Sequence, residues 1–127
     1  MTEHFDIIDE DDNVIGKAAR HECHGNPKLL HRSAGVLVFN SRGELLMHKR
    51  SMKVDTNPGK WSLSAWGHPG VGEGYEHAAK RELKEELGIE AKSLKQLFKL
   101  VYRDSVESEM FCIFRAESEG PFKLQED

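Results

Sequence analysis

The sequence predicts an α/β domain in which a helix packs on a mixed β-sheet as a sandwich, and three observations lead to this prediction. Several short apolar stretches are rich in β-branched and aromatic residues, as strands are. Residues 75–88 are rich in Ala, Leu, Glu and Lys and end at Gly88, which is typical of a helix. The chain has 127 residues, of which 38% are hydrophobic. We therefore expect residues 1–127 to form a single domain with its own core.

The first part of the chain is expected to form strands joined by polar turns. Residues 4–18 predict two strands around an acidic turn at 11–13. Residues 20–31 contain a Gly-Asn-Pro sequence and are expected to form a loop. Residues 33–50 predict a β-hairpin, because two apolar stretches flank the turn sequence Asn-Ser-Arg-Gly at 40–43.

The elements expected in the second part surround the helix. Residues 51–60 predict a polar loop, 61–66 a short strand and 67–74 a glycine-rich loop that leads into the helix. After the helix, residues 97–102 favour a strand, and the aromatic and β-branched stretch 109–117 predicts another.

Composition and charge argue against several classes of protein. The formal net charge is −4, so the chain lacks the basic surplus expected for binding a nucleic-acid polymer. No stretch approaches the roughly 18 apolar residues of a membrane span, and the acidic N-terminus is unlike a secretory leader. Cys23 and Cys112 form no CxxC pattern. A reduced, cytoplasmic protein is the simpler interpretation, and a disulfide is the alternative.

The charges on the predicted helix are segregated. At about 100° per residue, Ala79, Leu83 and Leu87 form a narrow apolar stripe. Like charges four residues apart repel by a few tenths of a kcal/mol. A solvated face with Glu–Lys pairs is one explanation, and a divalent cation shared by the carboxylates is the other. On one flank of the stripe lie three glutamates, Glu82, Glu85 and Glu86. The basic residues lie toward the other side of the helix and are His77, Lys80, Arg81 and Lys84.

The loop before the helix carries four glycines around Glu73. Its backbone amides, leading into a helix N-terminus, suit a phosphate group, and a plain glycine-rich connection is the alternative. Loop and helix together follow the spacing G-x5-E-x7-R-E-U-x-E-E-x-G-U, in which U is apolar. The residues are Gly67, Glu73, Arg81, Glu82, Leu83, Glu85, Glu86, Gly88 and Ile89. This pattern, over residues 67–89, is similar to the Nudix box and has no substitution.

The resemblance implies a Nudix-type α/β/α sandwich with a mixed sheet and a loop–helix–loop catalytic motif. It also implies Mg²⁺- or Mn²⁺-dependent cleavage of a nucleoside diphosphate linked to another group, and members of the family are often homodimers. The implied metal ligands are Glu82, Glu85 and Glu86, and Glu82 or a nearby carboxylate would help to activate water. Arg81 and Glu73 would orient the loop.

Three further residues are candidate contacts to the substrate. Gly67 opens the glycine-rich loop, where the backbone can approach a phosphate closely. Arg50 and Lys60 flank the polar loop and are candidate phosphate contacts, with a solvated surface role as the alternative.

A second set of residues lies outside the helix. His24 and His31 are seven residues apart, His68 follows Gly67, and Glu107 and Glu109 would face the same side of a strand. With the stretches "FDIIDEDDNVIG", "NPGKW" and "GHP", these residues resemble type I isopentenyl-diphosphate isomerases over roughly residues 4–114. The resemblance implies that these three histidines and two glutamates hold a divalent metal. Imidazole and carboxylate ligands suit Mn²⁺, Zn²⁺ or Fe²⁺, and Glu86 would meet a second ion, Mg²⁺ with the diphosphate.

The sequence departs from the isomerases in three places. Trp66 stands where they carry a catalytic cysteine before Gly-His-Pro, the Nudix box keeps acids that they lack, and the chain stops before their usual C-terminal strand and helix. Alkene isomerisation needs two opposed acid/base groups, and Glu109 supplies one. We therefore expect a hydrolase that cleaves the diphosphate linkage of a small organic molecule. The alternatives are an isopentenyl-diphosphate isomerase and a non-catalytic module that binds a nucleotide or phospho-metabolite.

Overall fold

The computed structural model describes residues 3–49, 61–62, 64–91 and 94–120. The elements in chain order are β1 (His4–Ile8), β2 (Val14–Ala19), α1 (Arg20–Cys23), β3 (Leu30–Phe39), β4 (Leu45–Leu46), β5 (His48–Lys49), β6 (Trp61–Ser62), β7 (Ala65–Gly67), α2 (Tyr75–Leu87), β8 (Lys95–Arg103) and β9 (Ser108–Glu117). No helix in these ranges is long and apolar enough to cross a membrane.

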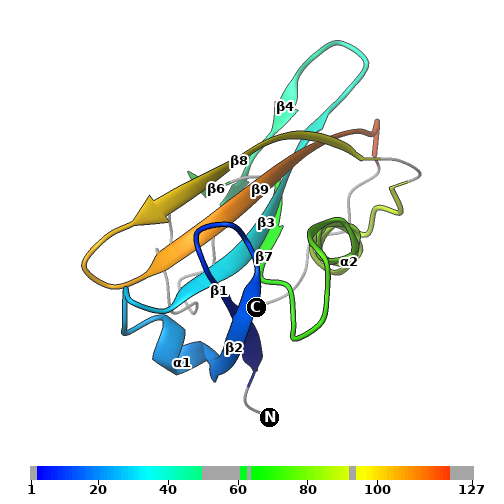
Figure 1. Cartoon of the computed structure of the whole chain (residues 1–127). Coiled ribbons are helices and arrows are strands. Elements are labelled where there is room, and N and C mark those ends of the chain that lie inside the picture. Colours follow the sequence, from blue (N-terminus) through cyan, green and yellow to red (C-terminus); the bar gives the residue numbers. More distant parts are fainter. Residues whose placement is uncertain (1–2, 50–60, 63, 92–93, 121–127) are drawn as a thin grey trace.

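The main sheet has the strand order β2-β1-β3-β9-β8, and β4 and β7 also pair with β3 (Figure 1). Strands β3 and β9 run parallel, whereas the other pairs of this sheet are antiparallel. Strands β5 and β6 form a separate two-stranded sheet. The predicted α/β fold with a mixed sheet and a central helix is confirmed. Of the two helices in the described ranges, only α2 is longer than one turn.

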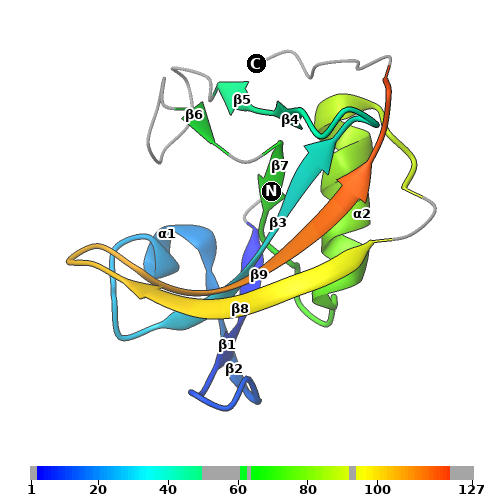
Figure 2. The ribbon, with the colours of Figure 1, turned by 90° about the horizontal axis from the view of Figure 1, so that it is seen from above.

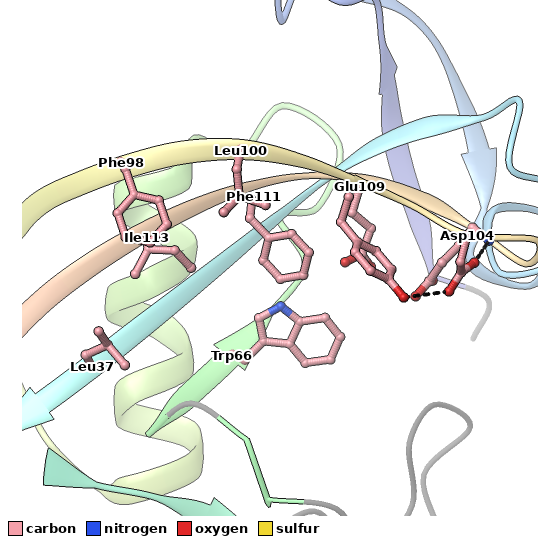
Figure 3. A pocket seen from close by; sticks show the side chains of 10 residues that line it. Leu37, Trp66, Phe98, Leu100, Asp104, Glu109, Phe111 and Ile113 are labelled. Carbon is pink, nitrogen blue, oxygen red and sulfur yellow. Dashed lines mark hydrogen bonds between the residues drawn. The ribbon is translucent and has the colours of Figure 1, made fainter.

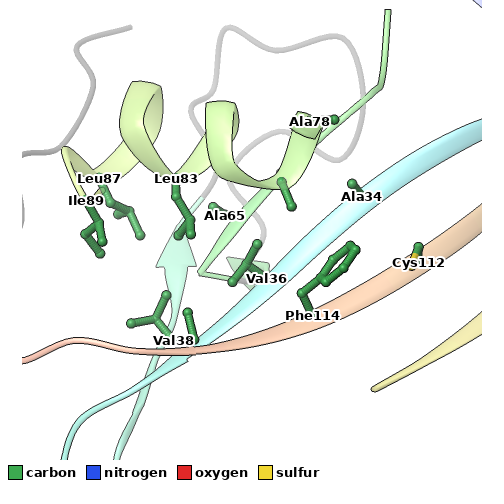
Figure 4. Packing of buried hydrophobic residues seen from close by; sticks show 12 residues of the cluster. Ala34, Val36, Val38, Ala65, Ala78, Leu83, Leu87, Ile89, Cys112 and Phe114 are labelled. Atoms are coloured by element: carbon green, nitrogen blue, oxygen red, sulfur yellow. The ribbon is translucent and has the colours of Figure 1, made fainter. Parts of the chain in front are cut away.

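Helix α2 packs on one face of the sheet, beside β3 and β9 (Figure 2). The predicted stripe is buried, and Leu83 and Leu87 meet the small and branched side chains of both strands (Figure 4). As expected, the helix ends at Gly88, whose φ of 69° is easily adopted by glycine. Cys112 lies in this core as a free thiol, and Cys23 is also free and buried elsewhere. Burial raises the pKa of both thiols, to about 11 for Cys23.

Two sequence-based expectations are wrong in detail. Residues 20–31 are not all loop, because Arg20–Cys23 form the one-turn helix α1, whose Glu22 carboxylate accepts a hydrogen bond from Ala19 N. Residues 61–66 are not one strand, because β6 and β7 belong to different sheets. Ser64 lies between the two strands in the sequence, and its hydroxyl donates a hydrogen bond to Leu46 O and accepts one from Val38 N. The expected loop at 51–60 lies outside the described residues, as do Arg50 and Lys60.

Asp12, in the turn between β1 and β2, joins four elements of the fold. It is the only non-glycine residue with positive φ in the described ranges, at 65°. Its carboxylate accepts hydrogen bonds from Arg32 Nε at 2.8 Å, Lys99 Nζ at 3.0 Å and Tyr75 OH at 3.1 Å. Burial acts to raise the pKa of Asp12, but these donors outweigh it and lower the pKa.

We expect Asp12→Ala to destabilise the fold by about 2 to 4 kcal/mol, because it leaves the Arg32 guanidinium without its charged acceptor and forces alanine into a left-handed conformation. Asp12→Asn should lose less, about 1 kcal/mol, because asparagine tolerates that conformation and keeps a neutral acceptor. Urea unfolding of the two variants beside the unaltered chain measures the difference. A cost below about 0.5 kcal/mol for alanine, as at an ordinary surface site, would contradict this role.

Candidate functional site

The glutamates of α2 line a cavity of about 380 Å³ between the helix and the end of β7. We call this the acid cavity. Its walls combine three carboxylates of the helix with two arginines and the loop that follows β7. The lining residues are Glu3, Arg20, Trp66, Gly67, His68, Arg81, Glu82, Glu85 and Glu86. Four of the residues expected to bind metal, the three glutamates and His68, therefore line one cavity together with Gly67.

Arg81 ties the glycine-rich loop to the acidic face of α2. Its guanidinium donates two hydrogen bonds to Glu73, at 2.9 and 3.0 Å, and others to Glu82 Oε1 at 2.7 Å and Glu85 Oε2 at 3.3 Å. Arg81 Nη2 also donates to the backbone carbonyl of His68 at 3.0 Å. The helical-angle prediction that Arg81 lies away from the glutamates is wrong, because its long side chain reaches around the helix to them. The hydrogen bonds from Arg81 are the main reason why the pKa of Glu73 falls to about 2.

Glu82 and Glu86 are held against β7. A Cβ atom on Gly67 would lie 2.3 Å from Cδ and Oε1 of Glu82, so only glycine leaves room for that carboxyl group. Glu86 Oε2 accepts a hydrogen bond of 2.9 Å from the backbone N–H of Trp66. Burial raises the pKa of Glu82 to about 7, against the opposing charge of Arg81. A carboxyl group with this pKa exchanges its proton near neutral pH.

Three histidines and one glutamate come together next to the acid cavity, and we call them the histidine cluster. Ligand atoms of His24, His31, His68 and Glu109 all lie within 4.8 Å of one another. Glu109 Oε1 is 3.3 Å from His31 Nε2 and 3.6 Å from His68 Nε2. Sheet register brings part of the cluster together, because His31 and Glu109 are direct partners of the parallel β3–β9 pair. Glu107 lies outside this group but contacts it through His24, with 3.4 Å between His24 Nε2 and Glu107 Oε2.

The hydrogen bonds of the histidines fit a metal site. Nδ1 lies 3.2 Å from Leu29 O in His31 and 3.0 Å from Arg32 O in His68, and because carbonyl oxygens only accept, each Nδ1 carries the proton. In the neutral form of each ring, Nε2 then presents a lone pair to the cluster. Within the described ranges, these two Nε2 atoms and Glu109 Oε1 are buried without a hydrogen-bond partner. Burial lowers the pKa of His68 well below its usual value, which keeps the ring neutral. Neutral imidazoles beside a carboxylate suit a divalent transition metal.

The two groups of residues are adjacent because His68 belongs to both. Its ring lies in the histidine cluster, and the residue also lines the acid cavity. Sequence reasoning missed Arg20, which lines the acid cavity from the first turn of α1. The available signal was its position four residues before His24, which places both residues on one side of a helical turn. This spacing is informative only if α1 is expected, and the sequence predicts a loop there.

Comparisons with known proteins agree with this architecture. The sequence profile of the NUDIX domain matches residues 29–127. An isopentenyl-diphosphate Delta-isomerase 2 of Photorhabdus laumondii is 38% identical over 102 residues, which are 80% of this chain and 56% of that protein. An uncharacterised Nudix hydrolase of Pseudomonas aeruginosa is 36% identical over 119 residues, 93% of this chain and 69% of that protein. The chain thus spans between about half and about two thirds of the length of these relatives.

A solved structure gives the same picture of the fold. The crystal structure of a Deinococcus radiodurans protein superposes with a TM-score of 0.81 at 25% sequence identity. The superposition covers 97% of this chain and 76% of the other.

We expect Gly67→Ala to destabilise the protein by about 1 to 3 kcal/mol, because the added methyl group overlaps the Glu82 carboxyl and forces helix and strand apart. Gly70→Ala is the matched control, since nothing lies within 4 Å of its Cβ position and its φ is not positive. The control should change stability by less than about 0.5 kcal/mol. Chemical unfolding of both variants decides the matter, and equal stabilities would show that Glu82 moves aside freely.

Proposed function

Because this chain belongs to the NUDIX domain family, we propose that it is a metal-dependent hydrolase that cleaves the diphosphate linkage of a nucleoside diphosphate derivative or related organic diphosphate. The observation that carries the proposal is the acid cavity, in which Glu82, Glu85 and Glu86 share a wall with two arginines. Three carboxylates alone would repel a diphosphate. Together with a divalent cation and a nearby arginine, they can hold one.

The charges around the cavity have separate tasks in this proposal. Arg81 donates to three carboxylates and a carbonyl group, so it orients the loop and is not the main contact to phosphate. Arg20 is the other cation of the cavity wall and is assigned to the diphosphate. Arg50 and Lys60, outside the described residues, remain proposed phosphate contacts.

Glu82, Glu85 and Glu86 would hold the ion, which supplies positive charge to the phosphate oxygens when bound. The Trp66 N–H donates to one carboxylate oxygen of Glu86 and so orients this carboxylate at the cavity wall. Glu82 or a nearby carboxylate would take the proton of the attacking water. The water oxygen then bonds to phosphorus as the bridging P–O bond breaks. Arg81 and Glu73 keep this arrangement by holding the loop against the helix.

The histidine cluster supports a second divalent site. We assign His24, His31, His68 and Glu109 to that ion, with Glu107 in contact through His24. The donor set of imidazole nitrogen and carboxylate oxygen favours Mn²⁺, Zn²⁺ or Fe²⁺. Glu109 is also the proposed acid/base group of this centre, since it lines a cavity on the far face of the sheet.

A second candidate function is isopentenyl-diphosphate isomerisation. The compact histidine cluster favours it, together with the 38% identity to a protein of that name. Trp66 opposes it, because its indole stands at the position of the catalytic cysteine and cannot transfer a proton at neutral pH. We therefore place hydrolysis first, and a module that binds without catalysis after both.

We expect Glu86→Gln to lower diphosphate cleavage at least about a hundredfold, because the amide keeps the shape of the side chain but loses the charge that holds the ion. Phosphorus NMR with Mg²⁺ or Mn²⁺ would follow nucleoside diphosphate sugars, dinucleoside polyphosphates and nucleoside di- and triphosphates. Glu76→Gln, on the exposed face of the same helix, is the matched control and should retain full activity.

Isopentenyl diphosphate belongs in the same panel, observed by proton NMR because isomerisation breaks no phosphate bond. Migration of its double bond without cleavage would establish the second candidate function. Full activity of Glu86→Gln would contradict the proposed role of that carboxylate. Saturable binding without turnover of any compound would leave the binding module.

We also expect Glu109→Gln to weaken Mn²⁺ binding at one of two sites by about 10- to 100-fold, since the carboxylate faces both His31 and His68. Calorimetric titration with Mn²⁺ should resolve two classes of site in the unaltered chain. His21→Asn, at an exposed histidine of α1, serves as the control and should change neither class. Unchanged binding in Glu109→Gln would remove the second metal centre from the proposal.

A further inference from the structure

A second cavity, of about 400 Å³, lies on the sheet face opposite α2 (Figure 3). We call it the aromatic cavity. Strands β8 and β9 form its wall with Phe98, Leu100, Phe111 and Ile113, and Trp66 lies across from Phe111. Figure 3 shows Leu37 and Ile113 at one end of the cavity and Asp104 at the other. Phe98 and Leu100 are 47% and 45% exposed, so their apolar surface is open to a ligand.

Carboxylates line both cavities, but only the acid cavity also has basic side chains among the described residues. The acid cavity has two arginines, Arg20 and Arg81. The aromatic cavity is lined by three carboxylates, Asp104, Glu107 and Glu109, and by no basic side chain in the described ranges. A phosphate group would be repelled from the aromatic cavity, whereas an uncharged organic group would not. Because Trp66 lines both cavities, a molecule with a phosphate end and a neutral end can occupy both at once.

The geometry of the aromatic rings indicates the shape of the neutral end. The Trp66 and Phe111 rings are within 19° of parallel, with centroids 6.2 Å apart. Tyr102 packs edge-on against Phe111 at 84° and 6.4 Å, and its hydroxyl donates to Asp104, which holds the Phe111 ring in place. Two parallel ring faces beside one apolar cavity favour a planar aromatic group, because such rings stack on each other's faces. A flexible aliphatic chain can contact the same apolar wall, but it gains no ring stacking from parallel faces.

We propose that the aromatic cavity binds the nucleobase of the substrate by stacking on Trp66 and Phe111, while the diphosphate lies in the acid cavity. This inference rests on the proposed function and narrows it to nucleotides. Trp66 becomes the residue that sets specificity: where an isomerase would need a proton donor, this chain offers a face for a ring.

Fluorescence of Trp66 tests base binding without any cleavage. The chain has two tryptophans, so Trp61→Phe leaves Trp66 as the single reporter. AMP and CMP should quench its emission in a saturable way, because a stacked base contacts the indole. Ribose 5-phosphate carries the same phosphate without a base and should not quench, and neither should isopentenyl diphosphate. Equal effects of AMP and ribose 5-phosphate, or no effect of any nucleotide at millimolar concentration, would overturn the proposal.

Phe111→Leu removes one ring while keeping an apolar side chain. It should weaken AMP binding by about tenfold, within the range observed for the loss of one base–aromatic stack. Phe114→Leu, on the face of β9 that packs against α2, is the matched control and should bind AMP as tightly as the unaltered chain. AMP binding unaffected by Phe111→Leu would overturn the proposal.

The two proposals fail in different ways. Base binding without cleavage of any diphosphate would refute the hydrolase and support the base site. Cleavage of aliphatic diphosphates at the same kcat/KM as nucleotides would support the hydrolase and refute the base site.

Discussion

The guanidinium group of Arg81 is the interaction on which the site depends. It gives α2 a positive charge among carboxylates that would otherwise repel one another, and it bonds the same helix to the loop through Glu73 and the His68 carbonyl. A planar fork of five N–H donors can serve several acceptors in fixed directions, which a lysine cannot do. His68 is part of both the acid cavity and the histidine cluster. By bonding the His68 carbonyl, Arg81 therefore also holds these two sites in a fixed position relative to each other.

Strand alternation distributes structure and chemistry between the faces of one sheet. Along β9, Cys112, Phe114 and Ala116 point to α2 and form the core. Glu109, Phe111 and Ile113, at the alternate positions of the strand, line the aromatic cavity. The same β9 segment therefore anchors the helix and builds a binding surface, and a shift of one residue in its register with β3 would exchange the two faces.

Local signals in the sequence were sufficient for much of the molecule. The helix and its glycine cap follow from residue type and spacing, whereas the histidines that gather around Glu109 were named through the resemblance to the isomerases. The break at Ser64 and the position of Arg20 could not be foreseen, because each depends on contacts between residues far apart in the chain. The course of Arg81 was missed although its partners are near in sequence, because helical angles place only the Cα–Cβ bond and not the end of a long side chain. The stacking of Trp66 on Phe111 is of the same kind: the sequence marks Trp66 as unusual, but only the pairing of strands shows what it faces.

The parallel pair β3–β9 has a consequence for how the protein is made. Leu30 pairs with Ser108 and His31 with Glu109, so the centre of the sheet joins segments from nearly opposite ends of the described chain. Contacts with so large a sequence separation form slowly, because a long loop must close before they yield any stability. During synthesis, β3 cannot pair with β9 until most of the chain has been made. The histidine cluster can therefore form only after the chain has been synthesised through Glu109, and chains that end before this residue never contain it.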